Sequence, residues 1–294
     1  MLATPAQLAQ TNDLDLIIRY VLAGLGHGIH AGRERGAGVE FSEYRAYAPG
    51  DEWRRVDWKL LARADRYYVR EAERDSHVAV WLWLDASASM AEASLAMPTV
   101  DKLWYARTVL ACVAAVAQRQ GDAFGLVVLS NGRVNFTPAA RGPRQMHRVL
   151  AQLSRAEASG ELPPAETLRA SLHFARSPSL VCAVSDFLDF PSPMTDALLR
   201  LRHMQHDVRA LCLQTRAEVE ASFPANKSYR DPEQGEGVFR FGPEAQAEYR
   251  RRRDEHFATV NAEWRKHDIR AQSACIEDPV ASVLRAWLRQ AGRA

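Results

Sequence analysis

The sequence predicts an α/β protein with a doubly wound, mostly parallel sheet. From residue 76 onwards, apolar strand-like runs alternate with segments in which apolar residues recur every three or four positions. Such alternation is typical of a parallel sheet that is covered by helices on both faces. The run 77–84 is largely apolar at successive positions, as expected of a central strand that is buried on both sides.

The first expected elements are a helix, a strand and a second helix. Residues 13–25 carry leucine, isoleucine and valine at helical spacing, which indicates an amphipathic helix. The strand 77–84 follows after a long polar segment. Residues 103–117 again have helical periodicity, and Gly121 is placed to close this helix in a left-handed conformation.

A hairpin is expected next. The run 124–130 is apolar enough for a buried strand, and Asn131-Gly132 is a dipeptide that two-residue hairpin turns prefer. The turn would lead into a strand at 133–137. Apolar residues at helical spacing then indicate helices at 146–153 and 168–175.

The remaining elements continue the alternation within a main domain that we assign to residues 76–294. They are strand 179–184, helix 194–201, strand 207–213, an excursion at about 214–242 with a short hairpin near 238–241, a long helix from about 243, strand 268–275 and a terminal helix opened by Asp278-Pro279. Glycine, proline and polar residues mark the excursion. Aspartate followed by proline suits the start of a helix.

The N-terminal part, residues 1–75, is expected to hold the first helix and a charged segment that packs on the main domain. Residues 40–75 contain nine acidic and eight basic residues with aromatic residues between them. A strip that binds nucleic acid would be poor in acids. Two interpretations stay open for this segment, namely an intramolecular layer of salt bridges and a surface for a protein partner. His27 and His30 lie among glycines, and we interpret them as loop residues rather than as a metal-binding pair.

Composition excludes several classes of protein. The 294 residues carry a net charge of +2, so no long-range field points to nucleic acid or to an anionic membrane. Apolar stretches fall short of the roughly 18 residues that a membrane span needs, and the start does not resemble a signal peptide. We therefore expect a cytoplasmic protein without membrane insertion. The cysteines are far apart, which favours buried thiols over zinc or redox sites: Cys112, Cys182, Cys212 and Cys275.

Asp85, Ser87 and Ser89 follow the predicted central strand at alternate positions. Their carboxylate and hydroxyl oxygens are ligands that suit Mg²⁺ or Mn²⁺. The alternative is that these residues only cap the next helix, since serine and aspartate favour that role. The end of the strand is also where ligands of doubly wound sheets bind.

Two further oxygen donors are expected at the same edge of the sheet. Asp186 follows the strand 179–184, and Thr167 lies in the loop before the helix at 168–175. With two carboxylates and three hydroxyls, such a site would leave a divalent cation able to accept one more carboxylate from a partner protein.

This arrangement resembles the metal-ion-dependent adhesion site of the von Willebrand factor A domain. The resemblance implies a von Willebrand factor A-like fold with Asp85, Ser87 and Ser89 in the first metal loop, Thr167 in the second and Asp186 in the third. Ala165-Glu166 precede the threonine, where that family usually has glycines.

The charged segment is similar to the signature of the bacterial domain-of-unknown-function 58 family. The motifs that carry this similarity lie at residues 36–45, which read Gly-Ala-Gly-Val-Glu-Phe-Ser-Glu-Tyr-Arg, and at residues 47–59, 62–63 and 68–71. Members of the family often carry N-terminal membrane helices, and this chain resembles the short soluble subgroup. The resemblance implies an association with MoxR-type AAA+ ATPases as an adaptor or chaperone-like partner. It implies no enzymatic activity.

Three functions follow from these observations. The first is a metal-dependent protein–protein interaction module that offers its ion to a partner's carboxylate and works with a MoxR-type AAA+ ATPase. The alternative is a metal-dependent phosphoester hydrolase that uses Asp85 and Asp186, although no histidine or lysine is placed by motif beside these loops as a general base. The third is a scaffold whose site does not bind metal.

Overall fold

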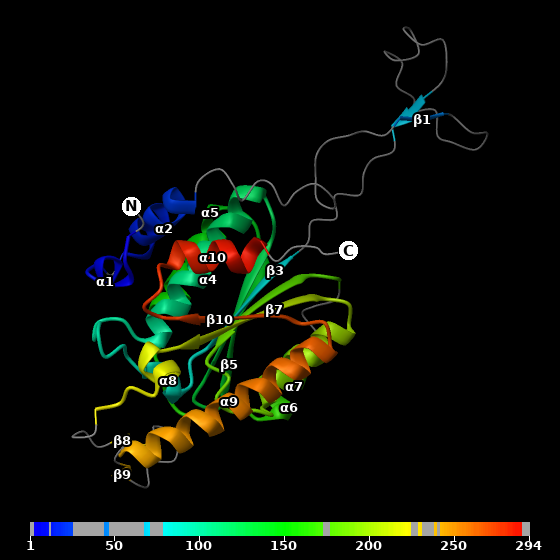
Figure 1. Cartoon of the computed structure of the whole chain (residues 1–294). Helices are drawn as coiled ribbons and strands as arrows, with labels where there is room; N and C mark the ends of the chain where they lie inside the picture. The colour runs from blue at the N-terminus through cyan, green and yellow to red at the C-terminus, as the bar shows by residue number, and fades with distance from the viewer. Residues whose placement is uncertain are drawn as a thin grey trace. The chain divides into compact units, whose positions relative to one another are not determined.

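The computed structural model describes residues 3–11, 13–25, 44–46, 68–70, 79–172, 177–224, 229–230, 238–239 and 242–289 (Figure 1). The chain divides into two compact units. The larger unit comprises Met1–Gly32 and Ala79–Ala294, and the smaller comprises Arg33–Val78. The first helices therefore belong to the same unit as the sheet, whereas the sequence interpretation grouped them with the charged segment in residues 1–75.

The larger unit contains a six-stranded sheet with the order β10-β7-β6-β3-β4-β5. All neighbouring strands are parallel except β4 and β5, which form the predicted hairpin. This architecture confirms the predicted α/β fold class. The strands are β3 (Val80–Asp85), β4 (Phe124–Ser130), β5 (Arg133–Ala140), β6 (Leu180–Ser185), β7 (Asp207–Gln214) and β10 (Arg270–Cys275).

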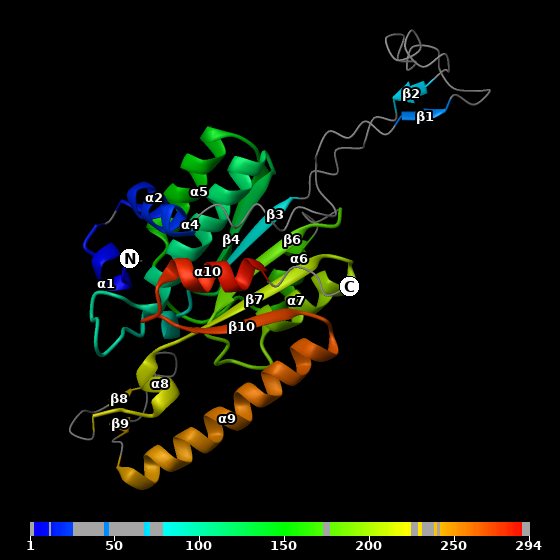
Figure 2. The same cartoon turned by 45° about the horizontal axis from the view of Figure 1, so that its top comes forward.

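Helices cover both faces of the sheet (Figures 1 and 2). One face packs against α2 (Leu14–Leu25), α4 (Lys102–Gln120), α5 (Pro143–Arg155) and α10 (Val280–Arg289). The other face packs against α6 (Ala165–Ser171), α7 (Pro193–His203) and α9 (Pro243–Lys266). Each of these helices matches a helix that the sequence predicted, with ends shifted by a few residues.

The central strand β3 supplies side chains to both cores, because successive residues of a strand point to opposite faces. Leu82 and Leu84 lie in the core under α4, whereas Trp81 and Trp83 lie in the core under α7. All six residues of β3 are buried. The continuous apolar pattern that predicted a central strand is therefore explained.

The shorter elements are α1 (Pro5–Leu8), the 3-10 turn η3 (Ala88–Ala91), α8 (Arg216–Glu220) and two small antiparallel ribbons. In one ribbon β8 (Tyr229–Arg230) pairs with β9 (Val238–Phe239) inside the predicted excursion. In the other, β1 (Tyr44–Ala46) pairs with β2 (Tyr68–Arg70) in the smaller unit. The five-residue helix α8 was not predicted.

Two turns match their sequence signals. Gly121 closes α4 in the left-handed region with φ of 75°. Asn131 and Gly132 connect β4 to β5 with φ of 49° and 68°, as expected of the hairpin turn that this dipeptide favours.

The remaining sequence predictions have mixed outcomes. Cys112, Cys182 and Cys212 are buried as predicted, and burial raises the pKa of their thiols to about 12, whereas Cys275 is only half-buried. Within the described ranges, no helix is both long enough and apolar enough to cross a membrane. His27, His30 and most of the charged segment 40–75 lie outside the described residues.

Candidate functional site

A pocket lies at the carboxyl ends of β3 and β6. These strands are parallel neighbours in the sheet, so their ends meet at the same edge. Asp85 is the last residue of β3, and Asp186 follows directly after β6. The pocket has a volume of about 400 Å³ and is lined by Asp85, Ser87, Ser89, Glu161, Leu162, Pro164, Ser185, Asp186, Phe187, Asp189, Ser192 and Pro193.

The loop after β3 brings Ser87 and Ser89 to this pocket. Ser87 precedes η3, but its hydroxyl makes no capping hydrogen bond to that turn. Its Oγ lies instead 3.2 Å from the Oγ of Ser89. The long helix α4 has its own cap, since Asp101 accepts a hydrogen bond from the backbone N–H of Trp104. Ser87 therefore does not have the helix-capping role that was the alternative interpretation.

The carboxylate of Asp85 is buried among neutral hydrogen-bond donors. Its Oδ1 accepts a 2.9 Å hydrogen bond from the backbone N–H of Ser87, and its Oδ2 accepts a 2.6 Å bond from the hydroxyl of Ser185. Burial and, next, the charge of Asp186 raise the pKa of Asp85 to about 6, although the hydrogen bonds from Ser185 and Ser87 oppose this rise. An ionised Asp85 is thus poorly compensated by positive charge.

Ser185 is a site residue that the sequence reasoning missed. As the last residue of β6, it donates to Asp85 and accepts a 2.9 Å hydrogen bond from the backbone N–H of Phe187. Phe187 has φ of 50°, which is uncommon for a bulky residue and bends the chain sharply after Asp186. Ser185 could have been identified from the sequence, because it is a polar residue beside Asp186 at the end of an otherwise apolar strand.

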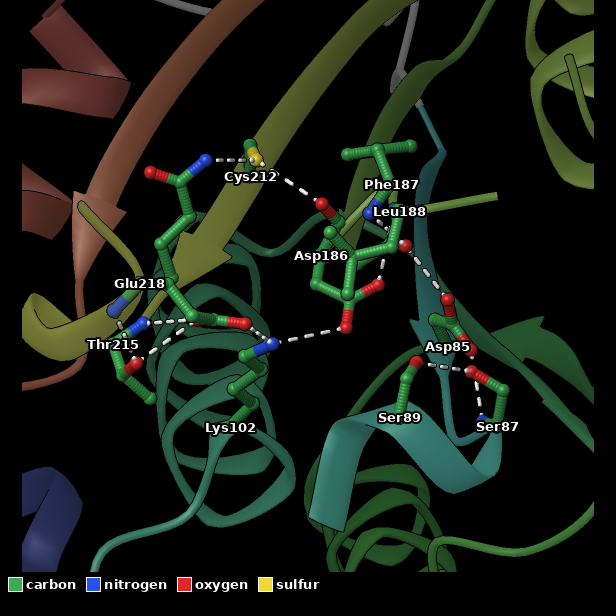
Figure 3. Close-up of polar contacts among 12 residues, drawn as sticks. Asp85, Ser87, Ser89, Lys102, Asp186, Phe187, Leu188, Cys212, Thr215 and Glu218 are labelled. Carbon is green, nitrogen blue, oxygen red and sulfur yellow. Dashed lines mark hydrogen bonds and ion pairs between the residues drawn. The ribbon is translucent and has the colours of Figure 1, made fainter. Parts of the chain in front are cut away.

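Asp186 makes a buried ion pair that the sequence did not predict. Its Oδ2 lies 3.2 Å from the ammonium of Lys102, which also lies 2.7 Å from Oε1 of Glu218 (Figure 3). Lys102 was not placed here by any sequence motif, and its role at Asp186 is that of a counter-charge and not that of a general base. Lys102 is the first residue of α4, and a helix that follows β3 begins at the edge of the sheet where β3 ends.

The charge of Lys102 is fixed by its neighbours. Burial alone would lower the pKa of its ammonium, but the carboxylates of Asp186 and Glu218 outweigh burial and raise the pKa above its usual value. Lys102 therefore remains protonated at neutral pH.

Thr167 is not brought to the pocket. Helix α6 begins at Ala165, directly after Pro164, so Thr167 lies in the first turn of this helix and not in the preceding loop. Its side chain is exposed, and the pocket wall at this point is formed by Glu161, Leu162 and Pro164. The sequence placed Thr167 in the loop before this helix, at the metal site, whereas the structure places it on α6 and outside the pocket lining.

The pocket is more acidic than predicted, because Glu161 and Asp189 line it together with Asp85 and Asp186. Partial burial and the charges of Glu161 and Asp186 raise the pKa of Asp189. Four carboxylates thus line one pocket, and the buried ammonium of Lys102 contacts one of them, that of Asp186. This excess of negative charge favours binding of a cation.

The donor set agrees with a hard divalent cation held by few carboxylates. Asp85, Asp186, Ser87 and Ser89 supply oxygen atoms from adjoining loops, and such oxygens together with water suit Mg²⁺ or Mn²⁺. Within the described ranges, no group of three or more histidine, cysteine, aspartate or glutamate side chains is arranged to hold a metal ion. An ion here would therefore depend on the serine hydroxyls and on water.

Comparison with protein families gives one match that covers most of the chain. The model for the family described as "Protein of unknown function DUF58" matches residues 43–262. The chain belongs to the DUF58 family. This finding confirms the family predicted from the motifs of the charged segment.

Relatives of this DUF58 chain include two mycobacterial proteins. They are the uncharacterized proteins Mb1516 of Mycobacterium bovis and Rv1480 of Mycobacterium tuberculosis. Each is 28% identical over 234 residues, which cover 79% of this chain and 72% of the relative.

Similar solved structures include the conserved hypothetical protein BatB from Bacteroides thetaiotaomicron, with 14% identity and a TM-score of 0.46 over 74% of this chain and 100% of BatB. The SpRpn10 VWA domain is 7% identical, with a TM-score of 0.42 over 70% of this chain and 93% of that domain.

Proposed function

We propose that this protein is a metal-dependent protein–protein interaction module that holds Mg²⁺ or Mn²⁺ in the pocket at the ends of β3 and β6. The observation that carries the proposal is the buried carboxylate of Asp85. It faces Asp186 and two serine hydroxyls, and the hydrogen bonds to its oxygens come from neutral donors. A divalent cation would supply the positive charge that this arrangement lacks.

The residues proposed to hold the ion are Asp85, Ser87, Ser89 and Asp186. Ser185 would keep Asp85 oriented through its 2.6 Å hydrogen bond. Thr167 is left out, because it is exposed on α6 and does not line the pocket. The bound ion would act as an electrophile that accepts an oxygen atom from a partner protein in place of a water molecule.

The negative charge of the pocket restricts which partner segments can bind to the ion. A lone carboxylate would be attracted to the ion but repelled by Glu161 and Asp189 at the same pocket. We therefore infer a partner segment that carries a carboxylate next to a lysine or arginine. Leu188 adds an apolar contact beside the pocket, since it follows Phe187 and is 44% exposed.

The proposed role in the cell is that of an adaptor for a MoxR-type AAA+ ATPase. Membership of the DUF58 family supports this role, because the resemblance from which the family was predicted also implies that association. The partner bound at the metal would then be distinct from the ATPase, which would have its own contact surface on the chain.

The ion pair of Lys102 does not support a phosphoester hydrolase. Lys102 contacts Asp186 but is held as a cation, so it has no free electron pair with which to act as a general base. A turnover assay with phosphoester substrates, run with and without EDTA, checks the distinction directly.

The test of the proposal combines metal binding with partner capture. Isothermal titration with Mg²⁺ and Mn²⁺ should show binding by the wild-type protein and none by Asp85→Asn. Affinity capture from a bacterial lysate should retain a partner in Mg²⁺ and release it in EDTA. Ser87→Ala should lower the affinity for Mg²⁺. Ser94→Ala is its matched control, because Ser94 is a buried serine that does not line the pocket. Equal titration curves for wild type and Asp85→Asn would refute the proposal.

A further inference from the structure

Lys102 places a buried positive charge directly behind Asp186, one of the residues that line the proposed metal pocket. Its side chain is 1% exposed, and its ammonium lies between two carboxylates, 3.2 Å from Asp186 and 2.7 Å from Glu218. Figure 3 shows the ammonium between these two groups, with Asp85, Ser87 and Ser89 on the far side of Asp186. Lysine is rarely buried to this extent without paired carboxylates. Asp186 and Glu218 supply that pairing for Lys102.

The two aspartates of the pocket are therefore not equivalent. Asp85 is bonded to neutral donors, whereas Oδ2 of Asp186 is already occupied by the Lys102 ammonium. The other oxygen, Oδ1, accepts a 3.3 Å hydrogen bond from the backbone N–H of Leu188. A cation that enters between the two aspartates must share Asp186 with Lys102.

Glu218 is anchored independently of Lys102. Its Oε2 accepts a 2.6 Å hydrogen bond from the backbone N–H of Thr215 and a 3.1 Å bond from the Thr215 hydroxyl, in a capping box at the start of α8. Its Oε1 remains directed at the ammonium at 2.7 Å. Lys102 would thus keep a charged partner even when its contact with Asp186 is weakened.

We propose that Lys102 is an internal competitor for the divalent cation, and that Glu218 retains the ammonium when Asp186 turns to the ion. This inference rests on the metal site proposed above. In the metal-free protein Lys102 neutralises Asp186, so the pocket stays folded without an ion. In the metal-bound protein Lys102 contacts Glu218 and no longer contacts Asp186. Because the ion pair between Lys102 and Asp186 must break first, the affinity for the ion is lower and binding is readily reversible.

The first test uses Lys102→Met, which removes the ammonium and keeps an unbranched apolar stem. Titration calorimetry should show Mg²⁺ binding at least tenfold tighter than in wild type. The melting temperature in EDTA should fall, because Asp186 and Glu218 lose their counter-charge. Addition of Mg²⁺ should raise that melting temperature by more than it does in wild type.

The second test separates direct competition from long-range charge. The double variant Lys102→Met/Glu218→Gln has the same net charge as wild type, and it should still bind Mg²⁺ more tightly than wild type. The single variant Glu218→Gln keeps the ammonium on Asp186 alone, and it should bind Mg²⁺ more weakly by a few-fold. Glu220→Gln is the matched control, because Glu220 is an exposed carboxylate on the same helix.

The outcomes distinguish this inference from the proposed function. Mg²⁺ binding by wild type that is unchanged in Lys102→Met and in the double variant overturns the role of Lys102 and leaves the metal site standing. Absence of Mg²⁺ binding in wild type and in all variants overturns both. Binding by Lys102→Met with none detected in wild type would support the competition but overturn the metal-dependent function proposed for the wild-type protein. If Lys102→Met does not fold, Glu218→Gln decides, and binding equal to that of Glu220→Gln would overturn the inference.

Discussion

The hydroxyl of Ser185 donates a 2.6 Å hydrogen bond to the carboxylate of Asp85 across the ends of two neighbouring strands. The two residues are 100 positions apart in the chain, and the parallel pairing of β3 with β6 brings them together. Because this bond uses one oxygen of Asp85 and the backbone of Ser87 uses the other, the carboxylate is held in one orientation toward the pocket.

Ser185→Ala should therefore weaken metal binding and lower stability. The substitution removes a donor to a carboxylate and leaves the N–H of Phe187 without its partner, a loss of about 2 kcal/mol for a hydrogen bond to a charged group. Chemical denaturation gives the change in stability, and titration with Mg²⁺ gives the change in affinity. Ser94→Ala serves as the control. An affinity equal to that of wild type would show that Ser185 does not position Asp85.

The metal-free protein should lose stability as the pH rises from about 4 to about 6, the window between the unfolded-state and folded-state pKa values of Asp85. The folded-state pKa of Asp85 is about 6, above its ordinary value of 3.8, so the folded state binds this proton more tightly than the unfolded state does. Between those two values the folded protein carries more protons, and its stability falls with rising pH. Melting curves in EDTA for wild type and Asp85→Asn measure the effect as their difference. A difference that does not change with pH contradicts it.

Thr167→Ala should leave Mg²⁺ affinity unchanged, whereas Ser87→Ala should lower it at least several-fold. Thr167 is exposed on α6, and Ser87 is buried in the wall of the pocket. The same titration measures both variants. A large loss of affinity in Thr167→Ala would restore the sequence-based assignment of this residue and place the metal site differently.

Gly125→Ala should destabilise the larger unit by about 1–3 kcal/mol, the usual cost of overpacking a core. A methyl group at this position would lie 2.4 Å from Cζ3 of Trp81 and 2.9 Å from the backbone nitrogen of Ala139. Urea denaturation measures the loss. Gly242→Ala is the control, since a methyl group there meets no atom within 4 Å. Equal midpoints for the two variants would contradict the packing of β4 against Trp81.

Cys275 should react with a thiol reagent before the other cysteines. It is half-buried, whereas Cys112, Cys182 and Cys212 are buried and burial raises the pKa of each thiol to about 12. The reagent should modify one thiol in the native protein at pH 8 and four after unfolding in urea. Mass spectrometry of the labelled peptides identifies the site. Rapid labelling of Cys182, which lies on a central strand, would be inconsistent with the sheet.

The sequence by itself determined the order and type of most elements. The unbroken apolar run of β3 and the helical spacing of α4 are local patterns. They can be read from the sequence because the faces of an element that are buried determine which of its positions are apolar. The position of Asp85, Ser87 and Ser89 at the end of β3 also follows from local pattern, because a polar run after a buried strand must lie at the edge of the sheet.

Only the tertiary structure decided which side chains complete the pocket. Lys102 is 84 residues from Asp186 and 116 residues from Glu218, and no local periodicity relates them. Their meeting depends on crossover connections that return each strand and helix to the same edge of the sheet. Thr167 shows the converse, since a one-turn difference in where α6 begins moves its side chain from the expected loop to solvent. Contacts between distant segments are set by packing of the whole unit, which short-range sequence patterns do not encode.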